Sequence, residues 1–411
     1  MPLYPFEQMK SVPSGLDYSL KDFLRQNKSN TELLMQIAES MGVSVEALQD
    51  TIAEHEANLE TTRRENWIIN GPFILWQRGV SAVSPGDGVY LADRFSHHHL
   101  NDGAVTISRS TDVPGSSLLP GVQYSFYVDV TTADASIGAT QYEAIRYRVE
   151  GYDAYQLYGR TCTLSFWVKS NKTGVYSVGF RNGGLDRSYV DEYTIYQPGV
   201  WEQKIITLPI NFSGGTNYWT NSYGLVIIWD LACGSTYLTS SLKTWLTGNY
   251  FSSSNQVNFM NSTDNYFQIT GVQLNIGSTA PPFIARPIQH EIALAERYYE
   301  KSYDLDVTPG TVTTTGAVYQ PYVSFPNVTA GYNIGSLYIP FRVKKRTSSV
   351  SVLVYSPNTG VTSNFYDHTA ATDVSCSASY SGSNGCMYYA VSPASSTYIA
   401  FSCQWSCNAE G

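Results

Sequence analysis

Aromatic and amide side chains crowd one stretch of the sequence, between residues 217 and 251. Flat rings can stack on the C–H faces of a sugar, and planar amides can read its hydroxyls, so this mixture suits glycan binding without catalysis. The same rings also suit a contact between subunits or ordinary core packing. The candidate glycan-binding residues are Tyr218, Trp219, Tyr223, Trp245 and Tyr250. By contrast, tryptophans within regular strand patterns or beside a conspicuous motif are expected in the core: Trp76, Trp167 and Trp229.

A second group of residues resembles catalytic machinery. Asp93 stands beside Arg94 and follows Arg78 by 15 positions. An aspartate between two arginines is expected to have a lowered pKa and to stay ionised, which makes it a poor general acid. We therefore expect a buried ion pair that joins the first strand to the next.

Motifs for nucleophilic, metalloprotease or nucleotide chemistry do not occur in the sequence: GxSxG, HExxH, the P-loop and GxGxxG are missing. We assign no catalytic residue and no cofactor. A pair of carboxylates for glycoside hydrolysis stays open, because the distance between them is set in space and not in sequence.

Three clusters could hold a metal ion, and each has a simpler interpretation. His97, His98 and His99 are adjacent, and side chains alternate along a strand, so they cannot all face one ion. We expect an exposed loop there. The acidic residues after Gly183-Gly184 could bind a structural Ca²⁺ but are expected in a solvated loop: Asp186, Asp191 and Glu192.

The cysteines form no recognisable framework. Cys162 and Cys233 are isolated, and the other four lie near the end of the sequence without CxxC spacing. Buried free thiols are the first expectation, with disulfides or a metal site as alternatives. We assign no metal ligand among Cys376, Cys386, Cys403 and Cys407.

Composition narrows the class of protein. Only 14% of the 411 residues are charged, whereas 32 are tyrosine, which is typical of strand-rich extracellular or virion proteins. The net charge is −9, and no Lys/Arg stripe interleaves with aromatics, so nucleic acid is not an expected partner. The basic run from Arg342 to Arg346 is expected to be a solvated strand end. No apolar run reaches the roughly 20 residues of a membrane span, and the start does not resemble a secretion signal.

Residues 1–66 differ from the rest because they hold 17 of the charged residues. Residues 1–20 are expected to form an extended arm. A first helix is expected from Asn30 to Gly42, and Ser44 caps a second one that runs to about Arg64. Apolar residues at 3-4 spacing form a narrow seam that predicts a trimeric coiled-coil stalk, with packing against the chain's own β domain as the alternative. The trimerisation residues are Val45, Leu48, Ile52 and Leu59.

The remainder predicts two all-β domains, a jelly-roll-like sandwich at 67–302 and a small antiparallel sandwich at 303–411. The first domain should end in a helix from Pro287 to Ser302. In the second domain, one strand face should carry Ile399, Phe401, Cys403 and Trp405. The strands predicted from β-rich runs between turn residues are 163–169, 175–180, 201–208, 225–229, 266–274 and 349–355.

Four pieces of sequence resemble phage tail-fibre and other virion proteins. They are Asn70-Gly71-x-Phe73-x-x-Trp76-Gln77-Arg78-Gly79 with Ala92-Asp93-Arg94-Phe95; Gly271-Val272-Gln273-Leu274-x-x-Gly277 with Pro282-Phe283; Ala295 to Ser302; and Tyr355-Ser356-Pro357-x-x-Gly360 with Trp405 to Glu410. Together they bracket residues 67–410. The sandwich also resembles jelly-roll carbohydrate-binding modules through Asn70-Gly71, Leu164 to Val168 and Trp201.

The resemblance implies a homotrimeric fibre on the outer surface of a virion, on its tail, made in the host cytoplasm. Residues 1–30 would dock on other virion proteins, and the β domains would bind host-surface polysaccharide without cleaving it. One alternative is a purely structural head-fibre, decoration or tail-assembly protein without a ligand. The other is a polysaccharide-degrading enzyme.

Overall fold

The computed structural model describes residues 42, 44, 65–324, 333–391 and 398–410. The chain separates into two compact units, residues 1–65 and 66–411, and every strand described below belongs to the second. The predicted arm and stalk, with Val45, Leu48, Ile52 and Leu59, lie outside the described residues and stay predictions. Among the described residues, no helix has the length and apolar character that crossing a membrane requires.

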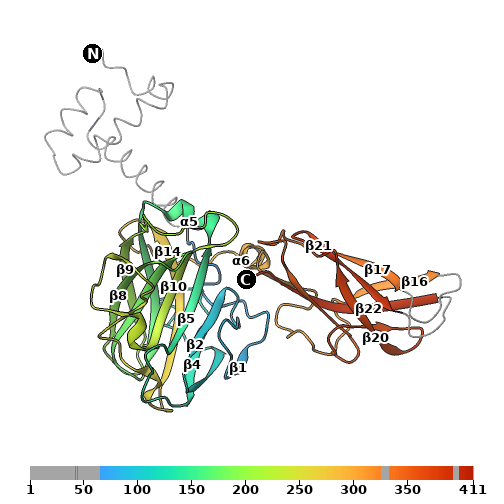
Figure 1. Ribbon diagram of the computed structural model, residues 1–411, viewed down its shortest axis with the longest axis horizontal. Helices are drawn as coiled ribbons and strands as arrows, with labels where there is room; N and C mark the ends of the chain where they lie inside the picture. Colours follow the sequence, from blue (N-terminus) through green and yellow to red (C-terminus); the bar gives the residue numbers. More distant parts are fainter. Residues whose placement is uncertain (1–41, 43, 45–64, 325–332, 392–397, 411) are drawn as a thin grey trace. The chain divides into compact units, whose positions relative to one another are not determined.

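Residues 66–276 contain two six-stranded antiparallel sheets that face each other across one core (Figure 1). Sheet 1 has the order β1 (Ser81–Val83), β3 (Ala104–Ser110), β4 (Ser125–Thr132), β14 (Tyr266–Ile276), β6 (Thr161–Ser170) and β9 (Glu202–Pro209). Sheet 2 has the order β12 (Trp245–Thr247), β8 (Arg187–Ile195), β7 (Gly174–Asn182), β10 (Tyr223–Cys233), β5 (Tyr142–Glu150) and β2 (Phe95–Leu100). The predicted β-sandwich is confirmed.

Period-2 alternation explains how one strand serves both faces of sheet 2. In β5, Ile145, Tyr147 and Val149 belong to the core between the sheets, whereas Ala144 belongs to a second apolar cluster on the outer face. Neighbouring β10 follows the same rule, because Ile227 and Trp229 point inward. The core expectation for Trp76, Trp167 and Trp229 is confirmed, with exposed fractions of 2%, 9% and 0%.

Short elements close the ends of the sandwich. The helix α5 (Gly151–Leu157) follows β5 directly and was not predicted, because its seven residues are too few for a helical period to stand out. The remaining pieces are the 3₁₀ turns η1 (Ser235–Tyr237) and η2 (Phe259–Asn261) and the two-residue parallel strands β11 (Leu238–Thr239) and β13 (Ser252–Ser253).

The exit helix is shorter than predicted. It is α6 (Ile288–Glu296), and β15 (Tyr299–Lys301) follows it where we expected further helix. Tyr299 to Lys301 instead pair with residues 406–408 of the last strand. Tertiary strand pairing has overridden the local helical pattern at this point.

The C-terminal strands are organised around the 11-residue strand β22 (Tyr398–Asn408). It pairs antiparallel with β15, β16, β18 and β19. Phe401, Cys403 and Trp405 share one core, as predicted from their alternation. The other strands are β16 (Val318–Ser324), β17 (Asn333–Pro340), β18 (Ser351–Tyr355), β19 (Asn364–Asp367), β20 (Thr372–Ser379) and β21 (Gly385–Val391).

The prediction of a solvated strand end for the basic run before β18 is wrong for Lys345, whereas Arg342 and Lys344 are exposed. Lys345 is fully buried and forms an ion pair with Glu300, which itself is fully buried. Arg342 pairs with Glu296 at 2.6 Å, and Arg346 donates to the carbonyls of Ala409 and Glu410. Lys345 and Arg342 thus neutralise acids of the α6–β15 segment, and the buried charge of Lys345 is stable because it is paired.

All six cysteines are free thiols in the structure, and five of them are buried. Burial raises the pKa of Cys376 and Cys407 to about 12 and that of Cys386 to about 11. Such thiols are protonated at neutral pH and are therefore poor nucleophiles.

Candidate functional site

A pocket of about 180 Å³ opens on the outer face of sheet 2. We call it the sheet-2 pocket. Strands β2, β5, β7 and β10 supply its floor, and the segments after β7, β10 and β12 supply its walls. It is lined by His98, Tyr142, Arg146, Arg148, Arg181, Leu185, Tyr223, Val226, Tyr237, Asn249 and Phe251.

Aromatic rings form one side of this pocket. The rings of Tyr237 and Phe251 stack with centroids 4.9 Å apart. Tyr142 meets both of them edge-on, at 5.6 Å from Tyr237 and 5.7 Å from Phe251. Because Phe251 is buried while Tyr142 and Tyr237 are half-exposed, the two tyrosines offer ring surface to a ligand.

Gly179 allows the segment of Phe251, which carries part of the aromatic wall formed by Tyr142, Tyr237 and Phe251, to lie close to the sheet. A Cβ atom at that position would stand 2.5 Å from the Cα of Phe251 and 2.6 Å from its carbonyl oxygen. The segment that carries Phe251 therefore rests directly on β7 because residue 179 has no side chain.

Positively charged groups form the floor. Arg148 and Arg181 both pair with Val226, from opposite sides of β10, so their side chains share the outer face. Arg146 donates to Ser96 at 3.2 Å and contacts the ring of His98 at 2.9 Å. The guanidinium of Arg148 lies 4.9 Å from the ring of Tyr223 and donates to the hydroxyl of Tyr90.

The electrostatics of the floor follow from this crowding. Burial lowers the pKa of His98 to about 4, and Arg146 and Arg181 add to that effect. Burial also lowers the pKa of Arg181 to about 10, helped by the charges of Arg146 and Arg148. At neutral pH the imidazole of His98 is therefore neutral, while the guanidinium of Arg181 remains charged.

The three histidines are not in an exposed loop, so that prediction is wrong. They belong to β2, and His97 and His98 are 2% and 7% exposed. The argument from alternation does hold, because His98 faces the sheet-2 pocket while His97 and His99 lie on the other face.

His97 and His99 bracket the fully buried carboxylate of Glu143, at 2.5 and 2.7 Å. Their ligand atoms lie within 4.8 Å of one another, a two-histidine, one-carboxylate set of the kind that binds transition metals. In the structure these groups bond to each other, and His97 Nδ1 is held by the carbonyl of Pro85 at 2.7 Å. Although burial opposes it, His97 and His99 lower the pKa of Glu143 to about 2. The three residues thus satisfy one another, with the carbonyl of Pro85 and the amide of Asn101 as further partners.

The acidic residues considered for calcium do not lie together in one loop. Asp186 precedes β8 and is bonded to Asn182 and Thr216. Asp191 and Glu192 lie within β8, on opposite faces of the strand. Lys243 lies 3.8 Å from Asp191, and Glu192 bonds Asn255, so these three acids do not converge on one point.

The five predicted glycan-binding residues occupy three different settings. Tyr223 lines the sheet-2 pocket. Tyr218 is 42% exposed and lies against Gly183, whereas Tyr250 is half-buried against Gly248. Trp219 and Trp245 are half-buried and pack against the core.

The two tryptophans surround the ring of Phe212, which is fully buried. Trp219 stacks on it at 5.6 Å and Trp245 meets it edge-on at 5.2 Å. Tyr155 and Tyr158 contact Trp219 from α5 and its end. We call these five rings the Phe212 cluster. The Trp245 indole also donates to the carbonyl of Pro209 at 2.6 Å, so its polar edge is satisfied within the chain.

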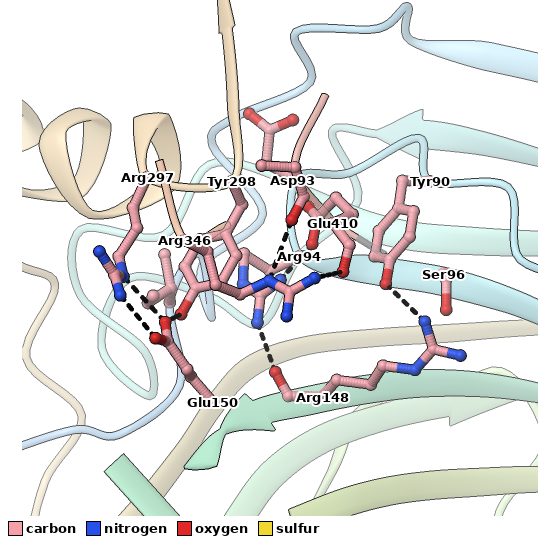
Figure 2. Close-up of polar contacts among 12 residues, drawn as sticks. Tyr90, Asp93, Arg94, Ser96, Arg148, Glu150, Arg297, Tyr298, Arg346 and Glu410 are labelled. Carbon is pink, nitrogen blue, oxygen red and sulfur yellow. Dashed lines mark hydrogen bonds and ion pairs between the residues drawn. The ribbon is translucent and has the colours of Figure 1, made fainter. Parts of the chain in front are cut away.

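Arg78, Asp93 and Arg94 join the sandwich to the C-terminal segment. The predicted ion pair between Arg78 and Asp93 is present at 3.0 Å. Arg94, however, pairs with Glu410 and donates to the carbonyl of Arg148, as Figure 2 shows. Beside it, Glu150 accepts from Arg297 and from the hydroxyl of Tyr298 (Figure 2).

The predicted lowering of the Asp93 pKa is wrong. Burial raises the pKa of Asp93 to about 6, and the opposing charge of Arg78 does not offset it. Of the two arginines expected as partners of Asp93, Arg94 instead pairs with Glu410, which is 316 residues away in the chain.

Sequence reasoning missed the residues that give the sheet-2 pocket its charge. His98, Arg146 and Arg181 come from three strands that only the fold brings together. One local signal was available. In residues 142–149, Tyr142, Ala144, Arg146 and Arg148 alternate with Glu143, Ile145, Tyr147 and Val149, which places the arginines on the face away from the core.

Comparison with known proteins finds partial likenesses in structure. No protein-family model and no curated protein sequence matches this chain. The enzymatically active domain of tailspike protein 4 of bacteriophage CBA120 aligns over 52% of this chain and 21% of its own, at 13% identity and a TM-score of 0.28.

Two carbohydrate-binding modules align over most of their own length. The family 11 module from Clostridium thermocellum, in complex with a β-1,3-1,4-mixed-linked tetrasaccharide, covers 49% of this chain and 99% of its own at 10% identity and a TM-score of 0.25. TmCBM61, in complex with β-1,4-galactotriose, covers 52% and 99% at 13% identity and a TM-score of 0.26. At such scores the function must be inferred from the geometry of the sheet-2 pocket.

Proposed function

We propose that this chain is the subunit of a virion fibre, a bacteriophage tail fibre, that binds host-surface glycan without cleaving it. The observation that carries the proposal is the sheet-2 pocket, where half-exposed tyrosine rings stand beside planar polar groups. Sugars present both C–H faces and hydroxyls, and this combination of partners suits them. The pocket is well below the roughly 300–1,000 Å³ of sites for drug-sized molecules, so one sugar unit of a longer glycan fills it.

The non-catalytic part of the proposal is supported by the lining of the pocket. Its 11 residues include no carboxylate, whereas glycoside hydrolysis uses two, about 5 to 10 Å apart. Prolonged incubation of the full chain with host polysaccharide should therefore release no new reducing ends. Release of reducing ends in proportion to the amount of purified protein would show that the protein is a polysaccharide-degrading enzyme instead.

The fibre part of the proposal is supported by the sequence of residues 1–66 and by the four virion-like pieces. Three weak sites on one trimer gain apparent affinity by multivalency without any new contact. Native mass measurement of the full chain and of a version lacking residues 1–66 tests this. We expect a trimer for the first and a single chain for the second, and a monomeric full chain would contradict the stalk.

The binding part is tested on the full chain with a panel of host-surface oligosaccharides. Tyr237→Ala removes one ring from the pocket, and Tyr196→Ala is the matched control, because Tyr196 is 74% exposed and is not among the lining residues. Weaker binding by the first variant alone supports the site. Equal binding by both variants would place the glycan elsewhere, and no binding even by the wild type would leave a purely structural fibre.

A further inference from the structure

Arg181 of the sheet-2 pocket is a buried arginine whose guanidinium has no carboxylate partner among the described residues. Its side chain is 4% exposed, and its Nε–H has no hydrogen-bond partner. Nη1 donates to the amide oxygen of Asn249 at 2.6 Å. No carboxylate among the described residues lies within ion-pair distance of this guanidinium, although 13 contacts at that distance join a lysine or arginine to a carboxylate elsewhere among them.

An unpaired buried cation is costly, and folded proteins pair such charges or bond them fully. Two other buried cations among the described residues do have a carboxylate partner, Lys345 with Glu300 and Arg94 with Glu410, in agreement with that rule. Arg181 breaks it, and it does so beside two more arginines, whose charges repel its own. Asp87, which is 47% exposed, lies 3.8 Å from Arg146 and bonds His98.

From this arrangement we propose that the sugar unit bound in the sheet-2 pocket carries a negative charge. This inference rests on the proposed glycan-binding function and names its ligand class, an acidic sugar with a carboxylate or sulfate group. The acid group would accept from Arg181, and from Arg146 or Arg148 beside it. The sugar ring would then lie against Tyr142 and Tyr237 on the aromatic side.

An extended polyanion fits this site less well than an acidic sugar. Binding of nucleic acid uses a basic track that follows a phosphate backbone over many residues. Here the cations gather in one pocket of a chain with net charge −9. A free inorganic ion would make no stacking contact with the aromatic wall beside these cations.

The test uses the full chain and oligosaccharides of equal length that are neutral, uronic-acid-containing or sulfated, together with inorganic sulfate and a single-stranded oligonucleotide. Calorimetric titration should give tighter binding to one or both acidic oligosaccharides than to the neutral one. Arg181→Gln should weaken acidic binding about 30-fold or more, the range for truncating a buried charged partner, and leave neutral binding unchanged. Arg109→Gln is the matched control, because Arg109 lies over the ring of Tyr124 in sheet 1.

Thermal unfolding separates a ligand-binding role from a structural one. If Arg181 is kept for a ligand, Arg181→Gln should unfold at the same temperature as the wild type or higher. A marked fall in unfolding temperature would instead make Arg181 a structural residue and overturn the inference.

The other outcomes of the titration distinguish failure of the acidic ligand from failure of glycan binding itself. Neutral and acidic oligosaccharides binding alike, with no effect of Arg181→Gln, would overturn the acidic ligand but leave the glycan-binding function intact. Binding of no saccharide at all would remove both. Sulfate alone binding as tightly as the sulfated sugar, or a preference for the oligonucleotide, would each exclude an acidic sugar as the ligand.

Discussion

The sheet-2 pocket and the Phe212 cluster are both rich in aromatic rings, yet they differ in where their polar groups find partners. In the Phe212 cluster the rings pack on one another, and the Trp245 indole N–H donates within the chain. In the sheet-2 pocket half-exposed tyrosines adjoin the buried Nε of Arg181, which has no partner. Abundant aromatics alone therefore do not identify a binding surface. What distinguishes the sheet-2 pocket is that its half-exposed rings lie beside the guanidinium groups of Arg146, Arg148 and Arg181.

The largest expected effect separates the two regions by stability. Phe212→Ala removes the ring around which Trp219 and Trp245 pack. It should lower the free energy of unfolding by about 3–5 kcal/mol, the usual cost of deleting a buried phenylalanine. Chemical denaturation measures this loss, and glycan affinity measured well below the midpoint should not change. Reduced affinity in the folded variant would mean that the cluster shapes the pocket.

A pH profile gives the next largest effect. The pKa of His98 falls from 6.5 to about 4 on folding, so the unfolded chain binds this proton more readily. The resulting stability is complete above pH 6.5 and is lost as the pH falls through 4, by about 3 kcal/mol in total. The difference in unfolding free energy between wild type and His98→Gln should show this slope. A pH-independent difference would contradict a neutral, buried imidazole in the pocket.

Gly179→Ala should lower both the stability of the fold and the affinity for glycan. Its Cβ would clash with the backbone of Phe251, so the aromatic wall must move away from β7. We expect a loss of about 1–3 kcal/mol in stability, as for other overpacked sites, together with weaker glycan binding. Gly214→Ala is a control, because no atom lies within 4 Å of a Cβ there, although its positive φ adds some strain. Stability falling without any change in binding would show that the wall does not contribute to the site.

The smallest expected change in affinity comes from removing one half-exposed ring. Tyr237→Ala should raise the dissociation constant for glycan about 3- to 10-fold, since one aromatic contact is worth about 0.5–1.5 kcal/mol. Its unfolding temperature should stay close to that of the wild type, because Tyr237 is half-exposed. A large destabilisation with unchanged affinity would make Tyr237 a packing residue like those around Phe212.

The sandwich was predictable because strand alternation is local. The runs at 163–169, 175–180 and 225–229 all became strands of the sandwich, as β6, β7 and β10. Exit-helix length was not predictable, since β15 exists only through pairing with β22. The burial of Lys345 depends in the same way on Glu300, which stands 45 residues earlier.

The candidate site was predictable only in part. Tyr223 belonged to the predicted set and lines the sheet-2 pocket, but the arginines there are isolated in the sequence and converge through the register of β5, β7 and β10. Such convergence needs long-range pairing that no local pattern encodes. The histidines were misplaced for a related reason, because their burial depends on Glu143 and Asp87 from other segments.

The position of β22 in the chain has a consequence for synthesis. Four earlier strands use it as a pairing partner, and two of them, β15 and β16, are translated more than 70 residues before it. Their edges lack this partner on the ribosome until β22 emerges, and exposed edges invite association with other nascent chains. A cell producing this protein would therefore need chaperones most while the residues between β16 and β22 are translated, and slower elongation before residue 398 would lengthen that vulnerable period.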